Sequence, residues 1–308
     1  MDIDQIIKDF LEKADKSEKM PLLVILGGTA SGKTSLSIDL AKRYQGEIIS
    51  TDSRQIYKYM DIGTAKIKKN EMHGIAHYMI DIVEPDEQYT LADFVNKATR
   101  HIEDIGKRGK LPILVGGTGL YIRAICQNYA ITRIPPNNAL REKLKQELEE
   151  KGEAYLYEKL KKADPHAAKK IHPHNHRYVI RALEIAASGK KKSYDKKESR
   201  YEVLKFGIEW DRETLYERIN TRAKEQVEEG LINETKMLLQ KGYDMSLPSM
   251  SSLGYPEMIR YIRKELSLEE ALALLQKNTR NYAKRQLTWF RREPDVIWIS
   301  GKKLATKS

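Results

Sequence analysis

The residues from Gly27 to Thr34 read GGTASGKT, which matches the pattern G-x-x-x-x-G-K-[ST]. The apolar run 22–26 predicts a buried strand before the motif, and an apolar-periodic segment predicts a helix from Lys33 to Tyr44. Glycines allow several backbone N–H groups to converge on one anion, and the helix N-terminus adds the positive end of its dipole. We therefore predict a phosphate-binding loop, in which Lys33 meets the terminal phosphates and Thr34 is the Mg²⁺ ligand. Its members are Gly27, Gly28, Thr29, Ala30, Ser31, Gly32, Lys33 and Thr34.

Two further predicted strands end in loops that could face the same ligand. EIIST (47–51) is followed by DSRQ (52–55), and LPILV (111–115) is followed by GGTGLY (116–121). In an open α/β sheet, ligands bind beyond the carboxyl ends of the strands. Judged alone, Asp52 is also compatible with a helix cap or a Mg²⁺ ligand, and the glycine loop with a plain strand-to-helix turn. The third strand ends in glycines where ATPases hold Mg²⁺ with an aspartate, which argues against an ATP-hydrolysing motor.

A basic helix is predicted near the C-terminus, because 271–292 contains six lysines or arginines and no acidic residue. The spacing of Lys277, Arg280, Lys284 and Arg291 places them on one helical face, with aromatic residues interleaved. Such a face suits a nucleic-acid backbone and unstacked bases, although a solvated face over an aromatic core has the same pattern. The net charge of the chain, +11, favours a contact with nucleic acid over a merely solvated face.

The whole chain has the composition of a globular protein, with 308 residues of which 40% are hydrophobic and 32% charged. Its apolar runs are far shorter than the roughly 18–20 residues of a membrane span, and the opening residues carry acids where a secretory signal carries bases. The single cysteine, Cys126, excludes an internal disulfide and a cysteine-built zinc cluster. We expect a cytoplasmic protein with no membrane partner, and a monomer.

Strands that alternate with helices predict an α/β fold, with a P-loop NTPase-like parallel-sheet core. The segment 126–200 differs, because it carries two charged helical stretches, a third helix near 177–188 and a basic loop. We therefore predict a helical insertion over 126–200. The catalytic core then comprises 1–125 and 201–308, with strands at 202–210 and 296–300 and with the basic C-terminal helices.

Three alternating histidines, His172, His174 and His176, could be considered as metal ligands. The intervening Pro173 and Asn175 favour a loop that leads to a helix cap, and no acidic or cysteine partner is near. No metal site is therefore expected there. The lysine run at 190–192 is interpreted as a solvated loop that could touch RNA, and Cys126 as a packing residue.

Several motifs together resemble the bacterial tRNA dimethylallyltransferases, a family of tRNA prenyltransferases. The motifs are GGTASGKT, DSRQIYKYMDIGTAK, YTLADF, GGTGLY, RALE, RINTR and YAKRQLTWFR, in order from about residue 21 to 292. The resemblance implies transfer of a dimethylallyl group from dimethylallyl diphosphate to the exocyclic N6 amine of the adenosine 3′ to the anticodon. It also implies a P-loop core with a channel and a helical insertion, with Mg²⁺ as cofactor.

The resemblance also implies roles for individual residues. Asp52 would be the base that takes the proton of the amine, with Thr34 and Arg222 as the other catalytic groups and Arg222 as the diphosphate clamp. Gly28 stands where the family usually has proline, and Tyr178 where a second basic residue is common, which weakens the RNA contact expected at Arg177. The expected tRNA-binding residues are Asp52, Ser53, Arg54, Gln55, Thr118, Arg177, Arg181, Arg280 and Lys284.

Two alternative functions remain open from the residues themselves. In a small-molecule P-loop kinase, Asp52 would deprotonate a hydroxyl and ATP would donate the phosphate. In an RNA-binding protein without chemistry, the basic helix would matter and Asp52 would not.

Overall fold

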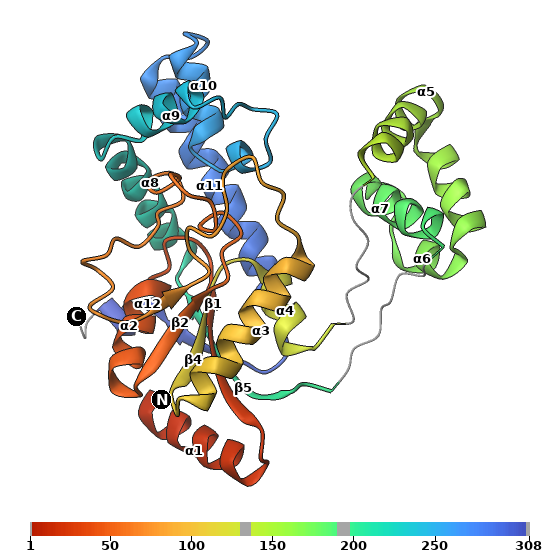
Figure 1. Cartoon of the computed structure of the whole chain (residues 1–308). Helices are drawn as coiled ribbons and strands as arrows, with labels where there is room; N and C mark the ends of the chain where they lie inside the picture. Colours follow the sequence, from red (N-terminus) through yellow and green to blue (C-terminus); the bar gives the residue numbers. More distant parts are fainter. Residues whose placement is uncertain (1, 130–136, 190–197, 306–308) are drawn as a thin grey trace. The chain divides into compact units, whose positions relative to one another are not determined.

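The computed structural model describes residues 2–129, 137–189 and 198–305, which form two compact units (Figure 1). One unit comprises Met1–Gln127 with Ser199–Ser308, and the other comprises Asn128–Glu198. The insertion predicted from the sequence covers 126–200, whereas this unit spans Asn128–Glu198. The lysine run at 190–192 lies outside the described residues.

The first unit is built on a parallel sheet, as the sequence predicts, and this sheet has six strands. Its order is β3-β2-β4-β1-β5-β6, and β1 lies between β4 and β5. The sheet register pairs Leu26 of β1 with Gly116 of β4 and Gly27 with Ile208 of β5, so the loops after these strands meet at one edge. The strands are β1 (Met20–Gly27), β2 (Gly46–Ser50), β3 (His77–Tyr78), β4 (Leu111–Gly116), β5 (Tyr201–Glu209) and β6 (Val296–Ser300).

Helices cover both faces of this sheet because the side chains of its central strand alternate between two apolar clusters. Leu23 and Ile25 of β1 pack in one cluster, and Leu22, Val24 and Leu26 in the other. Helices α1 and α2 contribute to the first cluster, and α3 and α4 to the second. Their bounds are α1 (Ile3–Lys16), α2 (Lys33–Arg43), α3 (Leu91–Lys107) and α4 (Gly119–Cys126).

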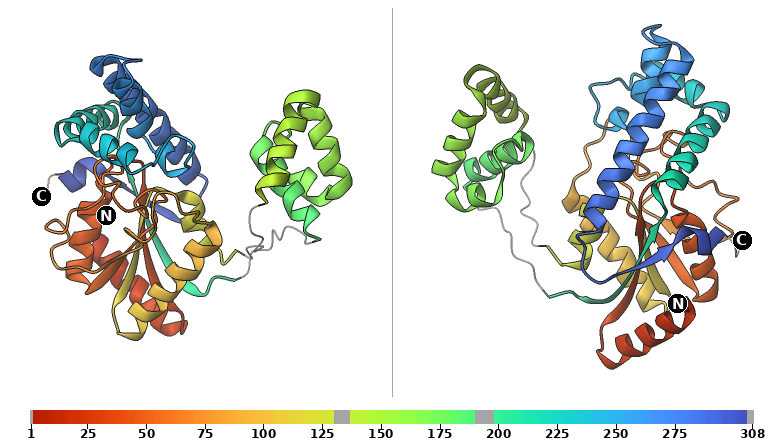
Figure 2. Two further views of the ribbon diagram at one scale, coloured as in Figure 1. Left: turned by 45° about the horizontal axis from the view of Figure 1, so that its top comes forward. Right: turned by 180° about the vertical axis from the view of Figure 1, so that it is seen from behind.

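A second helical layer follows β5 along the chain and has its own apolar cluster, which contains the buried Tyr255. Figure 2 shows its longest helix, α11 (Leu268–Phe290), in blue, running from the other helices of this layer towards the sheet. Ser267 and Glu270 form a capping box that starts α11. In the described parts of the chain, no helix is both long and apolar enough to cross a membrane. The remaining elements are α8 (Arg212–Glu228), α9 (Leu231–Gln240), η1 (Ser249–Ser251), α10 (Tyr255–Ile262) and α12 (Gly301–Ala305).

The second unit is helical and has a separate core of leucine and alanine side chains. Its helices are α5 (Asn138–Ala163), α6 (Pro165–Lys170) and α7 (His176–Ala187). Gly152 breaks α5 into two helical stretches with a φ of +77°, a backbone conformation that glycine adopts at little cost. The buried Glu184 of α7 accepts hydrogen bonds from the Asn137 N–H and from the Arg141 side chain, which ties α7 to the start of α5.

Candidate active site

The loop between β1 and α2 has the shape of an anion cradle. Gly32 starts α2 with a φ of +94°, which lets the chain turn into the helix with its first N–H groups exposed to the loop. The Lys33 ammonium curls back and donates to the Gly28 carbonyl, 2.7 Å away. The buried Ser31 Oγ has no hydrogen-bond partner within the described residues. This loop therefore offers a cation, a free hydroxyl and backbone donors to an anionic group.

Two cations and one carboxylate share the mouth of this loop. Burial and the nearby Arg222 guanidinium lower the pKa of Lys33 to about 8, while the Asp52 carboxylate raises it. Burial likewise lowers the pKa of Arg222, and Asp52 opposes that effect. Arg222 and Asp52 thus both act on Lys33, and Asp52 acts on Arg222, although the three groups come from α2, from α8 and from the loop after β2. The structure brings Asp52 and Arg222, two of the residues expected in catalysis, together with Lys33 of the predicted phosphate loop.

Asp52 is held by the loop in which it lies. Its Oδ1 accepts the Arg54 N–H at 2.8 Å, which forms a turn of the Asx type. The neighbouring Ser53 N–H donates to Thr118 Oγ1 at 3.1 Å, and the Thr118 N–H donates to the Thr51 carbonyl. The loops after β2 and β4 are therefore fastened side by side, with Asp52 and Thr118 at the same sheet edge.

Arg54 and Gln55, both expected to contact tRNA, make side-chain hydrogen bonds within the protein. The Arg54 guanidinium donates to the Pro248 carbonyl at 2.5 Å and to Ser251 Oγ at 3.2 Å. The Gln55 amide donates to the carbonyls of Thr64 and Ala65, and its oxygen accepts from Ser50. Both side chains thus brace the loop that carries Asp52.

Phenol groups lie around the Asp52 carboxylate. Burial raises the pKa of Tyr282 on α11, and the charge of Asp52 raises it further. Burial also raises the pKa of Tyr121 on α4, where Tyr57 and Asp52 add to the effect. Both phenols therefore stay neutral over the physiological pH range and add no negative charge beside the Asp52 carboxylate.

Three residues that the sequence analysis did not single out complete the cradle. Trp210 donates its indole N–H to the Ser31 carbonyl at 3.0 Å, and Arg218 donates to the Ala30 carbonyl at 2.9 Å. Gln286 of α11 accepts the Thr29 N–H at 2.8 Å and donates to the Gly117 carbonyl at 3.0 Å. A Cβ atom at position 117 would lie 2.1 Å from Gln286 Nε2, so only glycine admits this contact.

The residues of the loop fit a hydrated Mg²⁺ ion. Thr34 lies in the first turn of α2 and is exposed, and its hydroxyl makes no hydrogen bond to the residues that the structure describes. Mg²⁺ takes few protein ligands and completes its shell with water and substrate phosphates, so one hydroxyl beside an anion cradle suffices.

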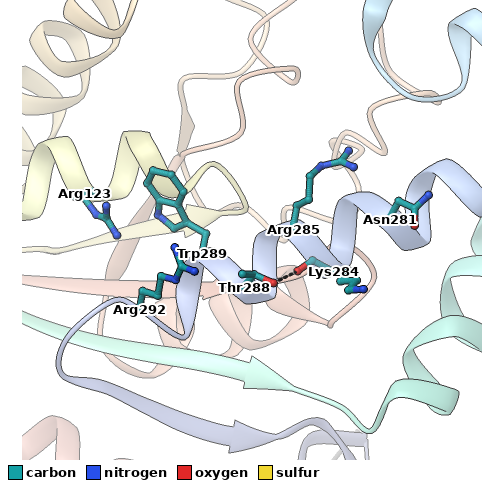
Figure 3. A pocket seen from close by; sticks show the side chains of 7 residues that line it. All are labelled: Arg123, Asn281, Lys284, Arg285, Thr288, Trp289 and Arg292. Carbon is teal, nitrogen blue, oxygen red and sulfur yellow. Dashed lines mark hydrogen bonds between the residues drawn. The ribbon is translucent and has the colours of Figure 1, made fainter. Parts of the chain in front are cut away.

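A basic pocket of about 470 Å³ opens between α4 and the C-terminal half of α11 (Figure 3). The Arg123 guanidinium stacks over the Trp289 ring at 4.4 Å and pairs with the buried Glu293. Lys284, Arg285 and Arg292 have no carboxylate partner within the described residues. We call these seven residues the α11 pocket: Arg123, Asn281, Lys284, Arg285, Thr288, Trp289 and Arg292.

The other basic residues expected on RNA lie elsewhere. Arg280 donates to Asn220 of α8 at 2.6 Å and lies over the Tyr216 ring, so its guanidinium is engaged within the protein. Arg291 follows the last residue of α11 as its C-cap. In the second unit, Arg177 is exposed and Arg181 pairs with the buried Glu184.

The family model described as IPP transferase matches residues 55–293 of the chain. Two relatives named tRNA dimethylallyltransferase, from Halothermothrix orenii and from Acetivibrio thermocellus, are each 50% identical over 285 residues. The matches cover 91% of this chain in both cases, and 87% and 91% of the respective relatives.

Solved structures of similar proteins lead to the same family. The tRNA isopentenylpyrophosphate transferase of Bacillus halodurans is 45% identical with a TM-score of 0.69, and the match covers 92% of this chain and 90% of the other. A eukaryotic dimethylallyltransferase acting on tRNA is 29% identical with a TM-score of 0.78, and the match covers 93% of this chain and 75% of the other.

Proposed function

The chain belongs to the IPP transferase family and is a tRNA prenyltransferase, and on that premise we propose its donor, its acceptor and the roles of its residues. The donor is dimethylallyl diphosphate, and the acceptor is the N6 amine of the adenosine 3′ to the anticodon. The allylic C–O bond breaks, a C–N bond forms, one N6 proton leaves and diphosphate is released. The small-molecule kinase is not favoured, because the relatives are named as dimethylallyltransferases.

The observation that carries this proposal is the grouping of Lys33, Arg222 and Asp52. Breaking the allylic bond places negative charge on the leaving diphosphate and cation character on the carbon. Lys33 and Arg222 supply fixed positive charge where the diphosphate develops its own, and such preorganised charge is worth more at a partly buried site than in water. Trp210 and Arg218 hold the cradle in shape through the Ser31 and Ala30 carbonyls.

Asp52 acts as the general base. The adenine amine is a weak nucleophile because its lone pair is delocalised into the ring, so removal of its proton in the transition state accelerates attack about 10²–10⁴-fold. The Arg54 N–H fixes Oδ1 of Asp52, while its other oxygen accepts no hydrogen bond within the described residues and is available for the proton. The adenosine must leave its stack to reach this point, which costs little in a single-stranded loop.

The proposed Mg²⁺ ion belongs to the same site. When bound, it would neutralise charge on the diphosphate, and Thr34 in the first turn of α2 would hold it. The chain itself contributes the hydroxyl, the cradle and the two cations.

The α11 pocket is the proposed contact for the RNA backbone and an unstacked base. Three of its cations lack a carboxylate partner within the described residues, and uncompensated positive charge beside an indole ring suits phosphate and nucleobase together. Among the basic residues expected on RNA, Lys284 lies in this pocket, whereas Arg280 packs against α8.

One assay tests the proposed reaction. The protein is incubated with Mg²⁺, dimethylallyl diphosphate and an unmodified anticodon stem-loop, and the RNA is weighed by mass spectrometry. We expect an increase by C₅H₈ without any nucleotide triphosphate. A matched stem-loop with inosine at the target position lacks the amine and should stay unmodified. ATP-dependent phosphorylation of a small acceptor would instead establish the kinase. Binding of RNA with no change in its mass would establish the RNA-binding protein without chemistry.

A further inference from the structure

Glu153, His174 and His176 form a cluster of potential metal ligands in the second unit. The ligand atoms of the three side chains lie within 4.8 Å of one another. His174 Nδ1 is 2.6 Å and His176 Nε2 is 3.1 Å from the same carboxylate oxygen, Glu153 Oε2. The expectation that these histidines have no acidic partner is therefore wrong, because the partner comes from α5, more than 20 residues earlier.

The backbone explains why these side chains converge. Gly152 breaks α5, so that Glu153 starts its second helical stretch at a fixed point. His174 lies in the loop between α6 and α7, and His176 is the first residue of α7. The Asn175 N–H donates to the His172 carbonyl and closes a turn there, so both imidazoles reach the carboxylate from the N-terminal end of α7.

His172 supports this arrangement from outside the cluster. Its ring lies 5.0 Å from that of His174, and its Nδ1 accepts the His174 backbone N–H at 3.3 Å. That ring nitrogen is therefore already engaged by the His174 backbone.

The donor set and its spacing suit zinc. Two imidazole nitrogens and one carboxylate oxygen are a common Zn²⁺ ligand set, with bonds of about 2.0–2.2 Å in tetrahedral geometry. Ligand atoms of such a site lie about 3.3 Å apart. His176 Nε2 is near that spacing from Glu153 Oε2 at 3.1 Å, whereas His174 Nδ1, at 2.6 Å, must move outward to admit an ion. The side chains of His174 and His176 are 70% and 42% exposed, so an ion has access and water can complete its coordination.

We propose that Glu153, His174 and His176 bind a divalent cation of the zinc type, with water as the fourth ligand. The bound ion replaces the two hydrogen bonds that the imidazoles of His174 and His176 make to Glu153 Oε2. It thereby cross-links α5 to the N-terminal end of α7. None of these residues belongs to the diphosphate or adenosine site, so the inference does not depend on the proposed transfer reaction.

Isothermal titration of the full, tag-free and chelator-stripped chain with ZnCl₂ tests the site. We expect one Zn²⁺ ion per cluster, and no comparable binding with MgCl₂, because imidazole favours Zn²⁺ over Mg²⁺. His174→Ala and Glu153→Gln should each weaken Zn²⁺ binding at least tenfold. His166→Ala, which removes an exposed histidine of α6 outside the cluster, is the matched control and should bind as the parent chain does.

X-ray absorption at the zinc edge provides a second, structural readout. We expect a shell of nitrogen and oxygen ligands at about 2.0–2.1 Å that includes two imidazoles. Unfolding curves in the presence of a chelator will show whether the variants keep the fold of the parent chain. Zn²⁺ binding that is equally strong in folded His174→Ala and Glu153→Gln chains would overturn the proposal, as would the absence of binding at millimolar Zn²⁺.

Discussion

Asp52 occupies a position in which its charge and its geometry can be separated experimentally. Its Oδ1 holds the local turn through the Arg54 N–H, and an asparagine can accept the same hydrogen bond. Only the carboxylate, however, can take a proton from the amine. The electrostatic effects on Lys33 and Tyr282 also depend on this charge.

We predict that Asp52→Asn lowers the single-turnover rate of prenylation about 10²–10⁴-fold and leaves the Kd for the stem-loop within about threefold. Rapid-quench kinetics and filter binding measure the two quantities. Asp86→Asn, an exposed position, is the control and should change neither. A matching loss of affinity would instead assign Asp52 to substrate binding.

We expect a different carboxylate, Glu47 of β2, to contribute to stability in acid. Hydrogen bonds from Arg108, Lys110 and Tyr78 lower the pKa of this buried group to about 2, although burial raises it. Its ordinary value is 4.5, so the stabilisation is complete above pH 4.5 and is lost as the pH falls from there towards 2.

Glu47→Gln should therefore lower the free energy of unfolding at pH 7 by about 2–3 kcal/mol and flatten its dependence on pH between 4.5 and 2. Urea unfolding at a series of pH values provides the measurement. Glu12→Gln, an exposed substitution on α1, should leave the curve unchanged. An acid limb that keeps its slope in Glu47→Gln would show that other groups are responsible.

At the scale of elements, helix α11 contributes both to an apolar cluster and to the α11 pocket. Its N-terminal half packs into the cluster around Tyr255, while its C-terminal half carries the α11 pocket and reaches the phosphate loop through Gln286. Replacement of the pocket cations tests the role of the α11 pocket without disturbing the apolar cluster, because Lys284 and Arg285 are exposed.

The triple variant Lys284→Ala, Arg285→Ala, Arg292→Ala should weaken stem-loop binding and flatten the plot of log Kd against log salt. The slope should fall by about 0.7–0.9 for each RNA phosphate that the variant no longer neutralises. Fluorescence anisotropy at several salt concentrations measures both effects. The control removes three exposed lysines of α1 and α3, Lys8, Lys16 and Lys107, and should keep the parent slope. An unchanged slope in the pocket variant would mean that RNA binds elsewhere.

The long elements were predictable because they carry a clear period. Segments such as 33–44 and 202–210 show the helical or strand pattern from which α2 and β5 follow. Helix α4 was not predicted, because GLYIRAIC is apolar on almost every side and gives no amphipathic contrast. Strand β3 was missed because two residues are too few to show any period.

At the scale of the whole molecule, the site depends on contacts that no local pattern encodes. The phosphate loop and Asp52 were predictable because motifs carry them. Trp210 and Gln286, by contrast, reach the loop across 179 and 257 positions of the chain. Glu153 meets His174 only because Gly152 redirects α5. Sequence spacing is informative within an element, whereas these partners are set by the way elements pack.

The division into two units leads to a prediction about the core. All residues of the proposed diphosphate site lie in the first unit, and near the junction with the second unit the Asn128 amide donates to the Glu198 carbonyl. Replacement of 129–197 by a short glycine-serine linker should therefore leave a core that unfolds cooperatively and binds diphosphate within about threefold of the parent affinity. Circular dichroism and titration with inorganic diphosphate measure this. A core that fails to fold would show that the insertion is part of one cooperative structure.

Gln286 has a consequence for how the two substrates influence each other. Its amide joins the Thr29 N–H of the cradle to the Gly117 carbonyl of the neighbouring loop, and it projects from the helix that carries the α11 pocket. We therefore expect a rearrangement that one proposed substrate imposes on its own surface to reach the surface of the other through Gln286. Thermodynamic linkage then makes the resulting change in affinity identical in both directions, whichever substrate arrives first.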